Sequence, residues 1–327
     1  MLIKNKNIKL SVIMPSKNEV EGIAYALEAW TGICEGLDCE IIVVDDSDDE
    51  TPEIVQQYME RYKSIKLIKG EGRGVGAARN LGFKHSTGEI IRWTDADGNL
   101  ESLNEGLVKR RKRWLYSVLE SFEDEEVDIV FSPGELWITD SILADGCSIQ
   151  RIDFDRSSEP VAYRKSVFRG LPISEGITVG EDMDSAMKAM RDRRKEACTS
   201  EPIYFFAPVF TLKHLISSHL WYGEDYLAFL KKHKKRGFVN VVGCLGYFAA
   251  VLLIPLAIFS WLFIFPFIFG VFMEYARQLK KFNICREKNL LSAWFFIPFP
   301  AYVQRVAFSV GFIAGMVKNI VRRFLRT

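Results

Sequence analysis

The chain has 327 residues, which is enough for one large domain or two ordinary ones. Its formal net charge is only +1, but residues 231–327 carry 15 Lys and Arg against two Asp and Glu, while the rest carries 28 against 40. A basic and apolar C-terminal part indicates contact with a membrane, and its long uncharged run argues against a nucleic-acid-binding face. We therefore expect membrane lipids, and no nucleic acid, among the partners.

Residues 8–131 alternate short β-rich runs with amphipathic stretches. The expected strands are Leu10–Pro15, Glu40–Asp45, Ile65–Lys69, Glu89–Thr94 and Val127–Phe131. The expected helices between them are Glu19–Trp30, Pro52–Tyr62, Val75–His85 and Leu103–Phe122. This alternation predicts an α/β domain with a mostly parallel central sheet. Ligands of such sheets bind outside the carboxyl ends of the strands, so the loops there should hold the site.

The C-terminal part is organised differently. An amphipathic, aromatic-rich stretch fills 211–236, and residues 237–273 then run for 37 positions without a charge. One straight helix of that length would be about 55 Å long, nearly twice a hydrocarbon core of about 30 Å. Basic residues flank the run on both sides, which favours a hairpin of two spans with its bend at Pro255 to Ser260. Segment 290–317 is broken by prolines and Arg305, and we expect it to be interfacial or re-entrant.

Two acidic segments indicate nucleotide binding. The first, Ser11 to Glu19, is a strand that ends at Pro15 and Ser16 and enters a helix, where free N–H groups and a carboxylate can hold a ribose or base. The second ends a buried strand at Asp45 and Asp46, whose desolvated carboxylates need donors such as ribose hydroxyls.

A third segment indicates a metal ion. Asp95-x-Asp97 follows an apolar strand, and this pattern suits Mg²⁺ or Mn²⁺ held by carboxylates and diphosphate oxygens. Arg79, in the glycine-rich stretch just upstream, is placed to add positive charge for a departing diphosphate. That stretch also contains Gly72-x-Gly74-x-x-Ala77, which matches a dinucleotide fingerprint and leaves an oxidoreductase as a rival hypothesis. The fingerprint belongs to the opening turn of a βαβ unit, which disfavours the rival.

A fourth segment, Gly180-Glu181-Asp182-Met183-Asp184, enters a helix about 85 residues after Asp97. We assign Asp184 to helix stabilisation, since acidic residues favour helix N-termini. Asp182 is the candidate general base, because a sugar hydroxyl must lose its proton to attack an anomeric carbon. Glu181 is the candidate for orienting the base or the acceptor.

Taken together, these segments resemble the family 2 glycosyltransferases. The matching pieces are Pro15-x-x-Asn18-Glu19, Val44-Asp45-Asp46 through Thr51, Gly74-x-x-Ala77-Ala78-Arg79-Asn80, Asp95-x-Asp97-Gly98 and Gly180-Glu181-Asp182. Arg164 to Phe168 also looks like the family's segment before the base. The similarity covers roughly residues 8–236, in the family's order, and extends to a small membrane-bound, cellulose-synthase-like branch that includes archaeal lipid-linked mannosyltransferases.

The resemblance implies a nucleotide-sugar-binding α/β fold, a Mn²⁺ or Mg²⁺ cofactor and inversion at the anomeric carbon. It implies nucleotide contacts at Pro15, Glu19, Asp45 and Asp46, metal and diphosphate roles for Asp95 and Asp97, and the base role for Asp182. The stretch with His214, Trp221 and Tyr222 looks like the family's interface helix, which places the two aromatic residues near the acceptor or the membrane interface. His214 then approaches the metal, although a packed or surface histidine is an equal alternative.

We expect a catalytic domain at 1–210, an interface helix at 211–236 and a membrane domain at 237–327, with the catalytic domain on the cytoplasmic side of a cell membrane. The expected activity is transfer of mannose from GDP-mannose to a hydroxyl of a lipid-linked glycan. A UDP-sugar donor and a polyprenyl-phosphate acceptor stay open, because polyprenyl-phosphate mannose synthases are also similar. A sugar-1-phosphate nucleotidyltransferase and a non-catalytic nucleotide-binding membrane scaffold are the remaining alternatives.

Overall fold

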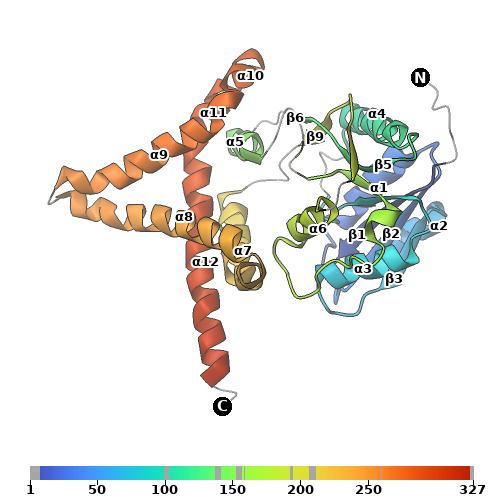
Figure 1. The fold of residues 1–327 in the computed structure, drawn as a ribbon, viewed down its shortest axis with the longest axis horizontal. Coiled ribbons are helices and arrows are strands. Elements are labelled where there is room, and N and C mark those ends of the chain that lie inside the picture. The colour runs from blue at the N-terminus through green and yellow to red at the C-terminus, as the bar shows by residue number, and fades with distance from the viewer. Residues whose placement is uncertain are drawn as a thin grey trace. The chain divides into compact units, whose positions relative to one another are not determined.

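A computed structural model describes residues 8–98, 103–136, 141–151, 157, 159–191, 194–205, 211–258 and 260–324. The chain forms two compact units. The first comprises Met1–Trp137, Ile152–Gly176 and Glu181–Pro208, and the second comprises Ile138–Arg151, Ile177–Gly180 and Val209–Thr327. Figure 1 shows the elements of both units.

The first unit is built on a seven-stranded sheet of order β3-β2-β1-β4-β7-β5-β8. The strands are β1 (Leu10–Ser16), β2 (Cys39–Asp45), β3 (Ile65–Lys69), β4 (Ile90–Trp93), β5 (Val127–Phe131), β7 (Ala162–Arg164) and β8 (Lys195–Cys198). Within this sheet, β7 is antiparallel to both of its neighbours, while the other pairs are parallel. A separate two-stranded sheet pairs β6 (Gly134–Leu136) with β9 (Ile203–Phe205).

Helices cover both faces of the main sheet, so its central strands are apolar on both sides. The helices of this unit are α1 (Ile23–Cys34), α2 (Thr51–Arg61), α3 (Val75–His85), α4 (Glu105–Ser121) and α6 (Glu181–Ala189). On one face, α1, α2 and α4 pack on alternate strand residues such as Val12 and Val43. On the other face, α3 packs on Ile42 and Val44. The result is a three-layer arrangement that leaves the strand ends to form a site (Figure 1).

Glu40 ties three elements of this layer structure together. Its carboxylate is 3% exposed and accepts hydrogen bonds from the hydroxyl of Ser11 on β1 (2.6 Å), from the backbone N–H of Thr87 (2.6 Å) and from Nζ of Lys66 on β3 (2.6 Å). Burial by itself opposes ionisation, but these donors outweigh it and lower the pKa of Glu40 to about 2. The ionised carboxylate therefore stabilises the junction of β1, β2 and the turn before β4.

The expected fold class is confirmed: an α/β domain with a mostly parallel sheet is followed by C-terminal helices. The five expected strands and four expected helices of residues 8–131 are all present, and their ends shift by at most four residues. Residues 132–210 contain elements that were not predicted from the sequence. These are the short strands β6 to β9 and helix α5 (Ile142–Arg151).

The second unit is helical. Its longer helices are α7 (Leu212–Lys232), α8 (Lys234–Leu253), α9 (Phe265–Gln278) and α12 (Pro298–Phe324), and its shorter ones are α5, α10 (Phe282–Glu287) and α11 (Leu291–Phe296). Residues 142–151 fall within the expected catalytic domain of residues 1–210, and the helix α5 that they form belongs to the second unit. One observed contact there is the hydrogen bond from Nζ of Lys281 to the carbonyl oxygen of Ile149 (2.7 Å).

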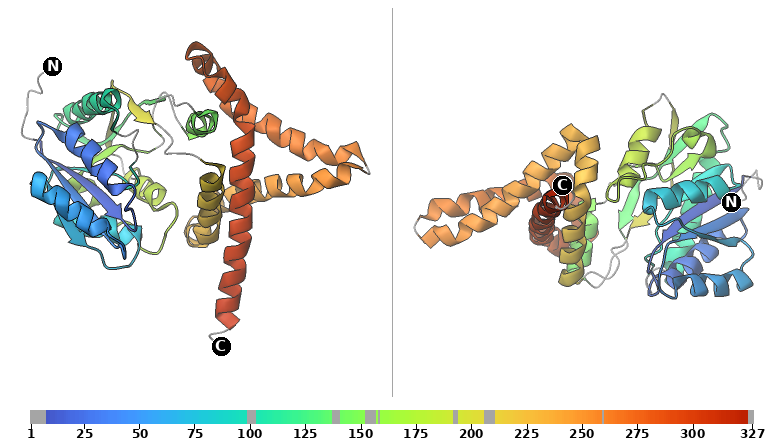
Figure 2. Two further views of the ribbon diagram at one scale, coloured as in Figure 1. Left: turned by 180° about the vertical axis from the view of Figure 1, so that it is seen from behind. Right: turned by 90° about the horizontal axis from the view of Figure 1, so that it is seen from below.

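Helices α7 and α12 pack side by side, as both views of Figure 2 show. Glycines make the close approach possible. A Cβ atom on Gly311 would lie 1.9 Å from the carbonyl oxygen of Leu220, and one on Gly315 would lie 2.3 Å from that of Glu224. On the other side, a Cβ atom on Gly223 would lie 2.0 Å from the carbonyl oxygen of Phe308. This spacing of small residues is typical of helix pairs in membranes.

Among the described residues, three segments are long and apolar enough to cross a membrane: Gly237–Leu256, Trp261–Glu287 and Leu291–Arg322. The uncharged run breaks where a bend was expected, because α8 ends at Leu253 and α9 begins at Phe265, with two short 3₁₀ helices between them. For 290–317 we expected an interfacial or re-entrant segment. That expectation stays a prediction, and the continuous α12 adds a full span as an alternative.

Candidate functional site

The loops after β1 and β2 are joined by hydrogen bonds at the carboxyl ends of the strands. The N–H of Asp46 donates to the carbonyl oxygen of Ser16 (2.9 Å), and the N–H of Asn18 donates to the hydroxyl of Ser47 (2.7 Å). Pro15 lies one residue before the end of β1. The two nucleotide-binding segments expected from the sequence therefore form one continuous rim.

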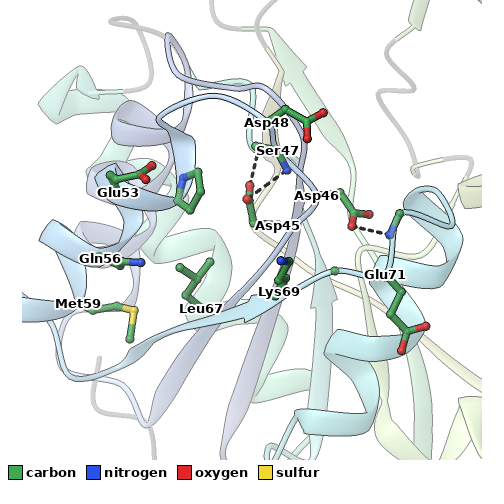
Figure 3. A pocket seen from close by; sticks show the side chains of 13 residues that line it. Asp45, Asp46, Ser47, Asp48, Glu53, Gln56, Met59, Leu67, Lys69 and Glu71 are labelled. Carbon is green, nitrogen blue, oxygen red and sulfur yellow. Dashed lines mark hydrogen bonds between the residues drawn. The ribbon is translucent and has the colours of Figure 1, made fainter.

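This rim borders a cavity of about 950 Å³. Its polar side is formed by Asp45, Asp46 and Ser47, and Figure 3 shows it closed below by Leu67 and Lys69 of β3. Helix α2 contributes the opposite wall; its lining residues include Pro52, Gln56 and Met59. A cavity of this size is typical of small-molecule sites.

The two aspartates at the end of β2 are held by protein donors. The carboxylate of Asp45, a residue only 5% exposed, accepts from the hydroxyl of Ser47 (2.7 Å) and from its N–H (3.2 Å). The carboxylate of Asp46 accepts from the N–H of Gly72 (2.8 Å), as the dashed lines in Figure 3 show. Asp46 therefore connects the nucleotide rim to the glycine-rich loop, and its orientation is fixed without a ligand.

The glycine-rich loop follows β3 and opens α3. Gly72 and Gly74 have φ angles of 66° and 91°, a backbone region that favours glycine, so the chain makes its turn there. Because this loop lies after the third strand, it does not form the opening turn that the dinucleotide fingerprint requires. The structure thus disfavours the oxidoreductase hypothesis.

Arg79 on α3 is the central side chain of the candidate site. It is 6% exposed and donates to the carboxylate of Glu181 at the start of α6 (2.7 Å) and to that of Asp95 after β4 (3.4 Å). Its Nε has no hydrogen-bond partner among the described residues. Burial raises the pKa of Glu181, Arg79 opposes that rise, and the nearby charge of Asp182 adds to it. The third and fourth sequence segments, 102 positions apart along the chain at Arg79 and Glu181, are thus brought together.

Asp182 lies next to this pair and is exposed, so it is accessible to a substrate. Its Oδ1 accepts the N–H of Met183 (2.7 Å). Asp184, in contrast, is 1% exposed and forms an ion pair with Lys188 one helical turn later (3.3 Å). That difference agrees with the expectation that Asp184 stabilises the helix.

A second acidic cluster joins the first and third segments. Burial, together with the charges of Asp97 and Asp95, raises the pKa of Glu19 to about 7. The reason for this proximity is close backbone packing: a Cβ atom on Gly98 would lie 2.3 Å from the amide nitrogen of Ala26 on α1. The three carboxylates therefore repel one another, and a cation among them would relieve that repulsion.

The described residues contain no group of three or more His, Cys, Asp or Glu side chains arranged to hold a metal ion by themselves. Divalent cations such as Mg²⁺ are commonly held by one or two carboxylates together with substrate phosphates. The oxygen donors of Asp95 and Asp97 fit such a shared site.

Arg92 is a candidate site residue, close to Asp95, that was not predicted from the sequence. It donates to the carbonyl oxygen of Val161 (2.8 Å), and its guanidinium lies over the ring of Trp114. Burial lowers the pKa of Arg92, while the charge of Asp95 raises it, so Asp95 lies in the field of two guanidinium groups. The available signal was an arginine inside the otherwise apolar strand Ile90–Trp93. The cavity wall formed by Gln56 and Met59 was also missed, because both are ordinary residues on a helix face.

His214, Trp221 and Tyr222 lie on α7, in the second unit. His214 is exposed, and the rings of Trp221 and Tyr222 are neighbours, with centroids 5.1 Å apart. The roles expected for these three residues at the metal or the acceptor stay predictions.

Comparison with known proteins identifies the class of this domain. Residues 11–134 match the family model described as Glycosyl transferase family 2. This part of the chain is therefore similar to family 2 glycosyltransferases, as the motifs had indicated.

Two curated relatives and one solved structure are informative. Glycosyltransferase AglE of Haloferax volcanii is 33% identical over 124 residues, which cover 37% of this chain and 38% of the relative. The dolichol-phosphate mannosyltransferase of Pyrococcus furiosus is 34% identical over 91 residues, or 28% of this chain and 26% of the relative. The chain thus spans well under half of the length of these curated relatives.

The solved structure is a mannosyltransferase from Pyrobaculum calidifontis in complex with GDP-Man and Mn²⁺. It superposes with a TM-score of 0.57 over 94% of this chain and 88% of that chain, at 15% identity. This similarity extends the shared fold beyond the matched domain and into the C-terminal helices.

Proposed function

We propose that this protein is a membrane-attached, inverting hexosyltransferase that moves a sugar from a nucleotide diphosphate to a lipid-linked acceptor. The observation that carries the proposal is the bridge from Arg79 to both Glu181 and Asp95. It joins the diphosphate side of the site to the helix that bears the candidate base, so donor and acceptor groups meet around one buried guanidinium.

The nucleotide occupies the cavity behind Asp45 and Asp46, with Pro15, Ser16 and Glu19 on its rim. GDP-mannose is the preferred donor in this proposal, since the solved mannosyltransferase with the shared fold contains GDP-Man. A UDP-sugar is the alternative. The guanidinium of Arg79 binds the diphosphate, because its positive charge complements the negative charge of the phosphate oxygens.

A divalent cation at Asp95 and Asp97, Mn²⁺ or Mg²⁺, would neutralise charge on the departing nucleotide diphosphate. The raised pKa of Glu19 supports this assignment, because, after burial, its main causes are the negative charges of Asp97 and Asp95 close by. His214 is a further candidate ligand of this cation. Asp45 and Asp46 are not part of the cation site, because protein donors already occupy their carboxylates.

Asp182 acts as the general base. Its exposed carboxylate takes the proton of an acceptor hydroxyl while that oxygen forms a bond to the anomeric carbon. The bond from that carbon to the diphosphate oxygen breaks at the same time, and the nucleotide diphosphate leaves. The attack comes from the opposite face, so the configuration at the anomeric carbon is inverted.

The second unit attaches the enzyme to a cell membrane through the three apolar segments, with the catalytic unit on the cytoplasmic side. Exposed Trp221 and Tyr222 on α7 are suited to the polar interface of a bilayer, where amphipathic rings concentrate. The acceptor that this interface would present to the enzyme is a glycan attached to a lipid carrier.

The Asp182→Asn variant tests the proposal. We expect transfer from radiolabelled GDP-mannose to a lipid-linked glycan to fall at least about 100-fold, in line with the usual contribution of a general base. Donor binding with Mn²⁺, measured by calorimetry, should change little because Asp182 is not on the nucleotide rim. Glu105→Gln, a first-turn carboxylate of α4, is the matched control. Unchanged transfer by the Asp182 variant would exclude Asp182 as the base.

Polyprenyl phosphate is a second candidate acceptor, favoured by the similarity to the Pyrococcus furiosus enzyme. A phosphate acceptor is already ionised at neutral pH and needs no base. If the Asp182→Asn variant retains transfer to polyprenyl phosphate and wild type gives no glycosylated glycan, this second acceptor is the substrate.

A further inference from the structure

The helical unit contains an apolar groove of about 690 Å³. Four helices line it through residues such as Leu220 of α7, Val251 of α8, Phe267 and Val271 of α9, and Val303 and Val306 of α12. The side chains that line the groove are hydrocarbon except for the hydroxyl of Tyr302. That hydroxyl donates to the carbonyl oxygen of Phe267 (2.5 Å). The volume falls within the range of about 300–1,000 Å³ that is typical of ligand pockets.

A charged cluster borders this groove. The buried carboxylate of Glu274 accepts from the guanidinium of Arg277 (2.5 Å), from that of Arg305 (3.1 Å) and from the hydroxyl of Tyr247. These side chains carry two positive charges and one negative charge. The ring of Tyr247 packs on Tyr302, which lines the groove, with centroids 4.8 Å apart. The cluster thus contacts the lining of the groove through the rings of Tyr247 and Tyr302.

Helix periodicity places the apolar and charged residues on the same faces. On α9, Phe267, Val271 and Glu274 follow one another at spacings of four and three residues, and on α8 Val251 follows Tyr247 by four. Both helices therefore change from hydrocarbon to polar side chains within one turn. An apolar surface with a cationic cluster beside its lining matches a lipid with an anionic head group.

The groove and the cluster lie in the segments that are apolar enough to cross a membrane. Ionisable residues in such segments are costly to bury and generally mark functional sites. One arginine is enough to neutralise the charge of Glu274. The second guanidinium therefore leaves a net positive charge next to the hydrocarbon groove.

We propose that this groove binds the hydrocarbon chain of a lipid phosphate, and that the surplus guanidinium charge at Arg277 and Arg305 holds its phosphate. The occupant is the lipid carrier of the acceptor, so the inference rests on the proposed function and adds a second binding site to it. Bulk bilayer phospholipid is the competing occupant. It differs in having two chains, and the test separates the two sources.

The full-length protein in nanodiscs of neutral phosphatidylcholine provides the test. Polyprenyl phosphate, polyprenol and phosphatidylglycerol are titrated in turn, and binding is measured by microscale thermophoresis. We expect polyprenyl phosphate to bind at least about 10-fold more tightly than polyprenol, which lacks the charge, and than phosphatidylglycerol, which has two chains. Equal binding of all three lipids would overturn the proposal.

Two variants separate the chain from the head group. Val306→Trp fills the groove and should weaken binding of polyprenyl phosphate at least about 10-fold. Val317→Trp, on the exposed part of the same helix, is the matched control and should bind as wild type does. Arg305→Gln should abolish the preference for polyprenyl phosphate over polyprenol. Unchanged binding by Val306→Trp would also overturn the proposal, and circular dichroism verifies that each variant remains helical.

Transfer assays distinguish failure of the groove from failure of the proposed function. A glycan acceptor with a short water-soluble chain does not need the groove, so Val306→Trp should lose at least about 10-fold more activity on the lipid-linked form than on the short-chain form. Loss of activity on both acceptors would overturn the chain-binding role. Selective lipid binding in a protein that transfers no sugar would support the groove and refute the transferase.

Discussion

At the scale of single residues, Arg79 organises the site. Its buried guanidinium contacts Glu181 at the start of α6 and Asp95 in the loop after β4. The pair with Glu181 is nearly closed to solvent, with side-chain exposures of 7% and 10%, whereas the carboxylate of Asp95 is 73% exposed. The first contact is therefore structural in character, and the second leaves Asp95 free to meet a ligand from the solvent side.

Removing the guanidinium should leave the carboxylate of Glu181 buried and uncompensated. We expect Arg79→Gln to reduce the free energy of unfolding by about 3–5 kcal/mol, and the double variant with Glu181→Gln to recover a large part of that loss. Thermal unfolding in detergent, followed by tryptophan fluorescence, measures both effects. A single variant as stable as wild type would mean that the ion pair contributes little.

Much of the candidate site was predictable because its residues follow strand ends. Asp45, Asp46, Asp95 and Asp97 each come directly after an apolar run, and parallel strands bring such positions to one edge. The ion pair between Arg79 and Glu181 was not predictable, since it depends on how a distant helix packs. Arg92 was missed because a buried arginine contradicts the strand pattern that the prediction relied on.

At the scale of secondary-structure elements, long periodic segments were predicted well and short ones were missed. Strands β6, β7 and β9 have three residues each, too few for an alternation to be recognised. The small residues of α12 were also overlooked, although Gly311 and Gly315 stand four apart in an apolar segment. Their role is visible only in the structure, where they admit the backbone of α7.

The pairing of α7 with α12 should depend on these glycines. Gly311→Ala places a methyl group against the carbonyl oxygen of Leu220, and we expect a loss of about 1–3 kcal/mol of stability from overpacking. Gly246→Ala on α8 meets open space and should be stabilising, because alanine favours helices by about 1 kcal/mol over glycine. Differential scanning fluorimetry of the two variants should therefore give shifts of opposite sign. Shifts of the same sign would argue against a tight α7–α12 contact.

At the scale of the whole molecule, charge and hydropathy divide the chain into an acidic N-terminal part, residues 1–230, and a basic, apolar C-terminal part, residues 231–327. Residues 231–327 contain all three candidate spans of the described residues, and the sequence indicated a membrane region here from one uncharged run and its basic flanks. The number of spans was less predictable, because prolines and Arg305 interrupt the last apolar segment without breaking its helix.

This division predicts how the protein fractionates. Apolar segments that cross a bilayer are not released by charge or pH, whereas a protein held by basic residues alone is released. We expect the full chain to remain in the membrane pellet after washing with alkaline carbonate, and a peripheral protein of the same membranes to serve as the released control. Recovery of the chain in the supernatant would instead indicate attachment to the surface.

The polypeptide passes between its two units several times before it reaches the final helices. Residues 138–151 and 177–180 belong to the helical unit although both of their flanks belong to the catalytic one. Recombination at a single junction, whether by a genetic crossover or in a laboratory fusion, would therefore split α5 from the helices on which it packs. The α/β unit therefore cannot be exchanged by itself without disturbing the packing of α5, and we expect the two units to be inherited together.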